Sequence, residues 1–303
     1  MRILILSRNP ELYSTSSLVT AAKSKGHFVR VVDHMHCDLI IENGLNEIVY
    51  EGYTLDGFDA AIPRIGHTAT RYGSAVVRQL EASGVFTTLK SEALLKARDK
   101  LSSLQWLAKH GIDIPKTIFG HSAYTSASLA HELEQFPKII KLLSGTHGLG
   151  VLKAENIGNL ETTLEAFYNL KQKVIIQEFI RESAGQDVRA FVVDGQIVAS
   201  MLRKAPPGEF RSNLHRGGSA RKIELSPEEE NIAIQAVKIM GLKVAGVDML
   251  RSERGPLVLE VNASPGLEGI ETTTRVNVSK KIIEFIERKV TGKKAKRKWM
   301  KHL

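Results

Sequence analysis

Two acidic residues and an asparagine in the C-terminal third of the chain have the types and spacing of a divalent-metal site. Asp248 and Glu260 each lie in an apolar run, VAGVDML and PLVLEVN, and the charged turn SERG joins the two runs. In the antiparallel hairpin that this pattern predicts, residues 248 and 260 lie close to opposite one another, with Cβ atoms about 4.5–5.5 Å apart. Two carboxylates at that distance repel each other unless a cation lies between them.

Asn262 supplies a third oxygen, because it lies two residues beyond Glu260 and so projects from the same face of the sheet. Carboxylate and amide oxygens are hard ligands, which suit Mg²⁺ or Mn²⁺ held beside a substrate phosphate. The alternative is a pair of structural acids that solvent or arginine side chains satisfy. The spacing alone leaves both interpretations open.

A glycine-rich segment and a lysine form a second candidate site for phosphate. The segment SGTHGLG at 144–150 lies between the apolar runs KIIKLL and VLKA. Its glycines would let backbone amides approach an anion, although it lacks the Gly-Lys-Ser/Thr of a Walker loop. Lys141 lies in the preceding apolar run, where a lysine needs an anionic partner. We interpret the segment as a lid over a phosphate, and the alternative is a flexible hairpin without a ligand.

Two further stretches contain residues suited to a nucleotide. EFRSNLHRGG at 209–218 combines Arg211, His215 and Arg216 with paired glycines, a composition that favours anionic groups. QEFI at 177–180 ends a strand with Glu178 beside Phe179, and could present backbone groups to an adenine. Read alone, the first stretch could be an ordinary surface loop and the second an ordinary strand.

The elements that must position these residues are mixed α and β. Residues 1–90 alternate strands (RILIL, FVRVV, DAAIP) with helices at about 14–25 and 71–82, which predicts a small parallel sheet without a G-x-G-x-x-G loop. We predict a helical stretch over about 91–110, then strands and helices through 180. A hairpin at Asp194-Gly195, a helix with a capping box at Ser226, and a final helix over about 277–290 follow.

Composition restricts the class of protein. The chain has 303 residues, of which 43% are hydrophobic and 25% charged, and it has no apolar run long enough to span a membrane. The single cysteine, Cys37, excludes an internal disulfide and a cysteine-based zinc site. We therefore expect a cytoplasmic protein. The last thirteen residues, TGKKAKRKWMKHL, carry six of the nine net positive charges. This tail is either a solvated terminus or a contact for RNA or an acidic protein.

Taken in order, these motifs resemble the ATP-grasp superfamily, and most of all the RimK family of ribosomal-protein-modifying α-L-glutamate ligases. The resemblance covers essentially the whole chain. It is carried by PRIG at 63–66, ARDK at 97–100, SGTHGLGV, QEFI, EFRSNLHRGG, AGVDML and VLEVNASPGLEGIE.

The resemblance implies an α/β fold with an N-terminal Rossmann-like pre-ATP-grasp domain (1–98), followed by a two-subdomain ATP-grasp fold. Its small lid subdomain would cover 99–180 and its large, metal-binding subdomain 181–290, before a basic tail at 291–303. The resemblance also implies ATP and two Mg²⁺ or Mn²⁺ as cofactors, L-glutamate as substrate and a homo-oligomeric assembly. The acidic C-terminus of a small-subunit ribosomal protein would be the acceptor. The expected contact of the basic tail with the ribosome or its RNA rests on the charge of the tail and not on the resemblance.

The resemblance also implies a role for individual residues. The ATP phosphates would be held by Lys100 and Lys141, the adenine by Glu178 and Phe179, and the nucleoside side by Asp187. Arg211, Ser212 and Asn213 would close over the triphosphate, Arg203 would stabilise the transferred phosphoryl group, and Asp248, Glu260 and Asn262 would hold the metals, with Glu260 bridging them.

In such ligases a carboxylate takes the γ-phosphoryl group to give an acyl phosphate and ADP, and an amine then attacks the acyl carbon. This chain offers the cations and metal ligands that phosphoryl transfer needs, and no evident Ser-His-Asp or Cys-His set. It departs from the family in reading TTLKSEALL, without an asparagine shortly before Ser91, in the two prolines of APPG at 205–208, and in its basic tail.

Three functions are consistent with the sequence. The first is a ligase that adds glutamate, in α-linkage, to a protein C-terminus or to glutamate itself. The second has the same chemistry with another acceptor, such as an amino-group carrier protein or a cofactor. The third is a non-catalytic nucleotide-binding module that docks on RNA, which the full set of metal ligands and Arg203 disfavours.

Overall fold

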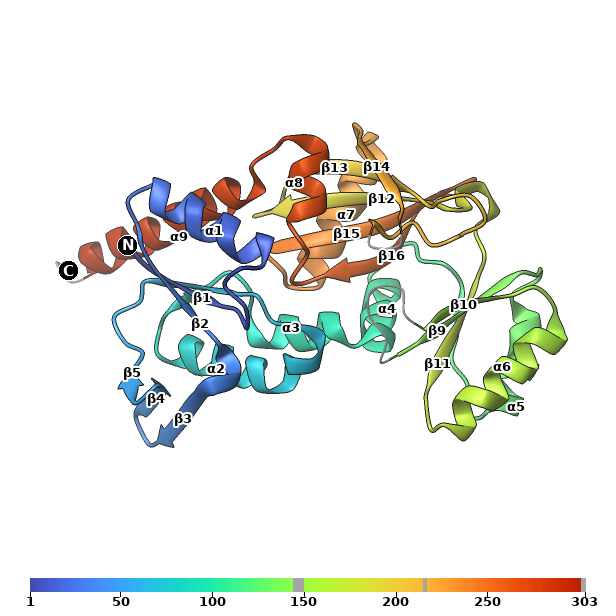
Figure 1. Cartoon of the computed structure of the whole chain (residues 1–303), viewed down its shortest axis with the longest axis horizontal. Helices are drawn as coiled ribbons and strands as arrows, with labels where there is room; N and C mark the ends of the chain where they lie inside the picture. Colours follow the sequence, from blue (N-terminus) through green and yellow to red (C-terminus); the bar gives the residue numbers. More distant parts are fainter. Residues whose placement is uncertain (144–149, 215–216, 301–303) are drawn as a thin grey trace.

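The computed structural model describes residues 1–143, 150–214 and 217–300. Most of the glycine-rich segment, together with His215 and Arg216, therefore lies outside the described residues. The described chain forms a parallel sheet, a small antiparallel sheet and a large antiparallel sheet, with a hairpin sheet at one edge (Figure 1). This is the mixed α/β fold that the sequence predicts.

The N-terminal part forms the parallel sheet, which has the strand order β2-β1-β6-β7. Its strands are β1 (Arg2–Leu6), β2 (Phe28–Val32), β6 (Ala60–Pro63) and β7 (Phe86–Thr87). The helices of this part are α1 (Tyr13–Ser24), α2 (Thr70–Ala82) and α3 (Ser91–Arg98), with short 3₁₀ turns at His34–His36 and His67–Ala69. The strand–helix alternation predicted for residues 1–90 is confirmed.

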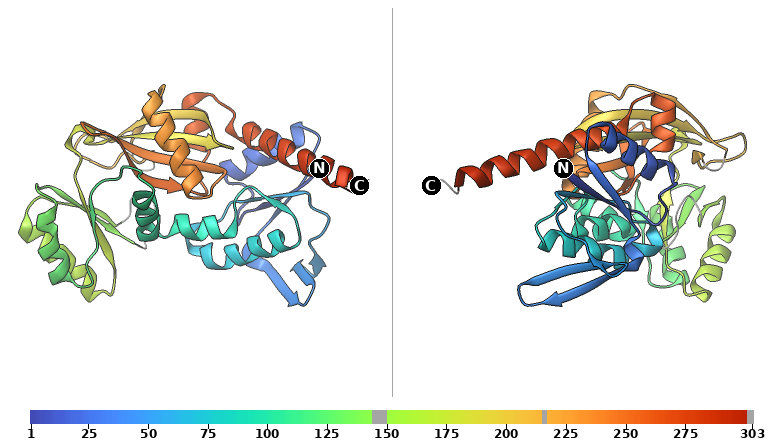
Figure 2. Two further views of the ribbon diagram at one scale, coloured as in Figure 1. Left: turned by 180° about the vertical axis from the view of Figure 1, so that it is seen from behind. Right: turned by 60° about the vertical axis from the view of Figure 1, so that its left-hand side comes forward.

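A hairpin sheet of β3 (Cys37–Glu42), β4 (Leu45–Tyr50) and β5 (Tyr53–Thr54) projects from this part, and the sequence analysis did not predict it (Figure 2). A signal was present, since Asn43-Gly44 separates two strand-like runs and Gly44 has a φ of 79°. Asn-Gly is among the strongest short-range indications of a two-residue hairpin.

The helical stretch predicted over about 91–110 is confirmed, and it consists of two helices. The structure divides it into α3 and α4 (Lys100–Lys109) at Asp99, whose backbone is extended, with φ −84° and ψ 103°. The side chain of Asp99 accepts a hydrogen bond from the backbone N of Ser102 at 2.9 Å and so caps α4. The break makes Lys100 the first residue of α4.

The small sheet has the order β10-β9-β11-β8 and is covered on one face by two helices. Its elements are β8 (Thr117–Ile118), α5 (Ala123–Leu129), a 3₁₀ turn (Ala130–Glu132), β9 (Lys138–Leu142), β10 (Val151–Ala154), α6 (Ile157–Asn169) and β11 (Val174–Glu178). Residues such as Ile140, Leu160, Leu164 and Val174 form a hydrophobic cluster that is separate from the rest of the core.

The large sheet is antiparallel, with the order β14-β13-β12-β15-β16. Its elements are β12 (Gln186–Val193), β13 (Gln196–Lys204), β14 (Ser219–Lys222), α7 (Pro227–Ile239), β15 (Val244–Ser252), β16 (Gly255–Asn262) and α8 (Glu268–Thr274), with a 3₁₀ turn at Arg181–Ser183 before β12. Asp194 and Gly195 both have positive φ, as the predicted two-residue hairpin requires, and Ser226 forms the predicted capping box with Glu229.

The large sheet is joined to the parallel sheet by shared hydrophobic clusters. Val188 and Val192 pack in one cluster with α7 and with Leu6 of β1, whereas Phe191 packs in the other cluster with α1 and α9 (Val278–Met300). These two parts therefore form one packed body, and the small sheet extends from it (Figure 1).

Helix α9 continues ten residues beyond the predicted end at Val290, to Met300. Figure 2 shows its C-terminal part extending away from the body. No helix in the described part of the chain is long and apolar enough to cross a membrane.

Candidate active site

The hairpin of β15 and β16 brings together the two acids predicted to bind metal. Asp248 pairs directly with Glu260, and Gly246 pairs with Asn262, so the predicted cross-strand arrangement is confirmed. A register shift follows Asp248, where β16 carries an extra residue. Asp248 is buried, at 7% exposure, whereas Glu260 is exposed. The Nδ2 atom of Asn262 lies 3.5 Å from Oδ2 of Asp248.

A row of alternating charges continues from this hairpin across the large sheet. Arg189 of β12 pairs with Asp248 and donates two hydrogen bonds of 2.6 Å to its carboxylate. Arg203 of β13 pairs with Asp187 of β12 and donates to both of its carboxylate oxygens, from Nε at 2.7 Å and from Nη2. The Nη2 atom of Arg203 also lies 3.0 Å from Asp248. The predicted residues Asp187, Arg203 and Asp248 are thus one network.

This network fixes the protonation of its members. Burial alone would raise the pKa of Asp248, but the charges and hydrogen bonds of Arg189 and Arg203 hold it below its ordinary value. Burial would lower the pKa of Arg203, and the two aspartates instead raise it. Asp248 is therefore a carboxylate and Arg203 a cation throughout the physiological pH range. Sequence reasoning missed Arg189, although its position two residues after Asp187 places both on one face.

Two lysines from other parts of the chain approach the same acids. Lys100 begins α4, and its Nζ atom donates to the carbonyl oxygen of Leu143 at 3.3 Å. Lys141 lies on the face of β9 opposite the helix-covered face. Burial lowers the pKa of Lys141 to about 8, while the charges of Glu260 and Asp248 act in the opposite direction and Lys100 lowers it further. Both predicted phosphate-binding lysines therefore lie within electrostatic reach of the hairpin.

The oxygen donors of the hairpin fit Mg²⁺ or Mn²⁺. Glu260 accepts no hydrogen bond and forms no ion pair within the described residues, so its carboxylate is available. The Oδ1 atom of Asp248 accepts one hydrogen bond, from Arg189, which leaves a lone pair for a metal. The described part of the chain holds no group of three or more His, Cys, Asp or Glu side chains spaced for a metal. The predicted site differs from such a group because its third ligand is an amide.

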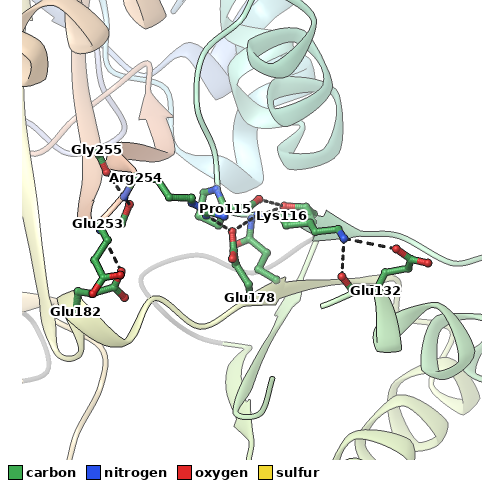
Figure 3. Close-up of polar contacts among 11 residues, drawn as sticks. Pro115, Lys116, Glu132, Glu178, Glu182, Glu253, Arg254 and Gly255 are labelled. Carbon is green, nitrogen blue, oxygen red and sulfur yellow. Dashed lines mark hydrogen bonds and ion pairs between the residues drawn. The ribbon is translucent and has the colours of Figure 1, made fainter. Parts of the chain in front are cut away.

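Glu178 lies where the small sheet joins the large one, and its carboxylate accepts hydrogen bonds from other residues of the chain (Figure 3). Its Oε1 atom accepts hydrogen bonds from the backbone N of Lys116 at 2.6 Å and from Nη2 of Arg254 at 2.5 Å. Nearby, Glu182 accepts a hydrogen bond from the backbone N of Glu253 at 3.1 Å. The side chain of Glu178 therefore anchors its own segment to the residues before β8 and to the β15–β16 turn.

Phe179 follows Glu178 and lies near the loop that carries Arg211. The Nζ atom of Lys153 is 5.8 Å from the ring centre of Phe179 and 6.0 Å from that of Phe210. Sequence reasoning missed Phe210, because an isolated aromatic residue in a loop gives no signal.

The loop after β13 is held to the small sheet. Arg211 donates to both carboxylate oxygens of Glu209, at 3.0 and 2.6 Å, and to the carbonyl oxygen of Val151 at 3.2 Å. Its hydrogen bonds lower the pKa of Glu209 to about 2. Ser212 is buried, and Asn213 is half-buried. The loop thus bridges the large and small sheets.

Comparisons with known proteins agree with this geometry. Residues 97–286 match the RimK-like ATP-grasp domain, and residues 1–94 match the RimK PreATP-grasp domain. The chain belongs to the RimK family of ATP-grasp proteins. A relative from Nitrosococcus oceani, named "Probable alpha-L-glutamate ligase", is 52% identical over 96% of this chain and 97% of its own length. "Probable alpha-L-glutamate ligase 1" of Hahella chejuensis is 51% identical over 97% of each chain.

Solved structures of low sequence identity show the same fold. The ATP-grasp ligase PsnB, complexed with a minimal precursor, superposes with a TM-score of 0.75 at 20% identity and covers 95% of this chain and 98% of its own. A D-alanine–D-alanine ligase from Bacillus anthracis, complexed with ATP, gives 0.67 at 18% identity, with 98% and 99% covered. This RimK-family chain is an ATP-dependent carboxylate–amine ligase.

Proposed function

We propose that this RimK-family ligase is an α-L-glutamate ligase that forms peptide bonds through an acyl phosphate and releases ADP. The observation that carries the proposal is the cross-strand pairing of Asp248 with Glu260, within electrostatic reach of Lys100 and Lys141. Cations on one side and metal-binding oxygens on the other are what a triphosphate requires. The names of the relatives supply the amino acid.

Each group has a defined part in the proposed reaction. Bound ATP would supply the phosphoryl group that activates a carboxylate, and two Mg²⁺ or Mn²⁺ held by Asp248, Glu260 and Asn262 would neutralise its charge. Lys100 and Lys141 would bind phosphate oxygens. Arg203 would stabilise the negative charge that develops during transfer, and its hydrogen bonds to Asp187 hold it in place before substrate arrives.

We further propose that the acceptor is acidic: the C-terminus of a small-subunit ribosomal protein, a growing poly-α-glutamate chain, or both. The composition of the stretch 209–218, with Arg211, His215 and Arg216, favours an acidic acceptor. The basic C-terminal segment favours a contact with RNA or the ribosome.

Product analysis tests this proposal. The protein is incubated with ATP, Mg²⁺ or Mn²⁺, each amino acid in turn and a panel of acidic or neutral peptides, and the products are identified by mass spectrometry while ADP release is followed. We expect ADP release that depends on glutamate, and peptides extended by glutamyl residues. ADP release that is indifferent to glutamate but responds to another amino acid would refute the assignment.

A further inference from the structure

The parallel sheet contains a point where the strand order reverses. From β1 the chain crosses to β2 on one side and later returns to β6 on the other side of β1. In open parallel sheets, ligands bind in the crevice outside the carboxyl ends of the strands at such a point. Here that switch point lies between the end of β1 at Leu6 and the end of β6 at Pro63. None of the residues assigned above lies at the ends of these two strands.

Two arginines lie near this switch point. Arg64 follows β6 directly, and its Nη2 atom donates to the carbonyl oxygen of Pro265 at 2.7 Å. Arg98 ends α3, and its Nη2 atom donates to the carbonyl oxygen of Ile65 at 2.5 Å. Both guanidinium groups are thus fixed in position by neutral backbone oxygens.

The arginine pair lacks an anionic partner in contact. Within the described residues, no carboxylate forms a hydrogen bond or an ion pair with Arg64 or Arg98. The Nε atom of Arg98 is buried and has no hydrogen-bond partner. Burial, and then the charge of Arg98, lower the pKa of Arg64 to about 10. Two half-buried cations near one another repel unless an anion meets them, and an arginine edge with an unused donor suits a carboxylate.

This switch point of the parallel sheet adjoins the predicted metal site. The segment that follows Asn262 lies against it, since Ser264 donates to the carbonyl oxygen of Pro63 at 3.3 Å and the backbone N of Leu267 donates to Ser14 at 2.9 Å. The charge of Glu260 also acts on Arg98. A ligand held by the arginine pair would therefore lie beside the reacting groups.

We propose that Arg64 and Arg98 bind a substrate carboxylate other than the one that ATP activates. The inference rests on the proposed function, because a glutamate ligase must recognise carboxylates that take no part in the reaction. The incoming glutamate brings two of them, and an acidic acceptor brings its side chains. Lys100 and Lys141 already approach the phosphate position, so the arginine pair is left for the organic substrate.

The test compares Arg64→Met and Arg98→Met with Arg64→Lys, and uses Arg78→Met as control because Arg78 is exposed on α2 of the same part of the chain. We expect both methionine variants to raise the KM for glutamate or for the acidic peptide by about 10- to 100-fold, with the KM for ATP unchanged. Arg64→Lys should retain part of the affinity, and Arg78→Met all of it. A rise for glutamate assigns the carboxylate to the incoming amino acid, and a rise for the peptide assigns it to the acceptor.

Calorimetric binding of glutarate to the full-length protein separates this inference from the proposed function. If wild-type protein does not ligate glutamate but binds glutarate in a way that depends on Arg64, the carboxylate site stands and only the proposed function fails. Thermal unfolding confirms that each variant is folded. Unchanged KM values and unchanged glutarate affinity in folded Arg64→Met and Arg98→Met proteins would overturn the inference, as would a rise in the KM for ATP alone.

Discussion

Asp248 and Glu260 offer a matched pair of substitutions, because they lie opposite one another but differ in their surroundings. Glu260→Gln removes an exposed charge with no ion pair among the described residues, so the free energy of unfolding should change by less than about 0.5 kcal/mol. Asp248→Asn removes the buried charge that compensates Arg189 and Arg203, so the free energy of unfolding should fall by about 3–5 kcal/mol. If both acids bind metal, both variants should lose ligation by about 100-fold or more.

Urea unfolding and the rate of ADP release measure the two effects separately. Glu260→Gln should unfold like the wild type and yet be nearly inactive, which would separate its role from folding. Full activity of Glu260→Gln would refute metal binding by Glu260 and leave β16 with a structural role alone. A loss of stability as large as that of Asp248→Asn would show that Glu260 is a structural partner of Lys100 and Lys141 rather than a metal ligand.

Three further predictions concern groups around the site. Burial lowers the pKa of Lys141 to about 8, so between pH 8 and 10.5 the unfolded chain keeps this proton while the native protein loses it. The free energy of unfolding should therefore rise with pH across this window. Urea unfolding of Lys141→Met at several pH values should lack that rise. Arg254→Met should lower the free energy of unfolding by less than about 1 kcal/mol, because the side chain of Arg254 is 55% exposed. The same substitution should raise the KM for ATP in initial-rate assays, because it releases the carboxylate of Glu178 from its ion pair. Removal of residues 292–303, which follow the buried Val290, should leave the rate of ADP release unchanged and weaken RNA binding in a filter assay. A fall in the rate of ADP release as large as the fall in RNA binding would contradict this prediction.

The metal hairpin could be predicted because its information is local. Two apolar runs, a short charged turn and a period of two residues are enough to place residues 248 and 260 opposite one another. The same local logic predicted Asp194-Gly195 and the cap at Ser226. The hairpin sheet of β3, β4 and β5 was not predicted, although Asn43-Gly44 is a local signal of the same kind.

The contacts that complete the site could not be predicted in this way. Arg189 reaches Asp248 across 59 residues of sequence, and Arg254 reaches Glu178 across 76. The pairing of strands β12 and β15 decides the first contact, and the packing of the small sheet against the large one decides the second. The break at Asp99 also depends on local capping competing with helix propensity, and apolar periodicity does not register that competition.

The separate hydrophobic core of the small sheet bears on how the protein unfolds locally. Because Ile140 and Leu160 belong to a cluster that the rest of the core does not share, this region can open without exposing the interior of the main body. Native-state hydrogen exchange should therefore resolve β9–β11 as a unit of lower protection than β1 and β12. Since Lys141 is carried by that unit and the acids by the main body, occupation of the site would couple the two, and the protection of both should then rise together.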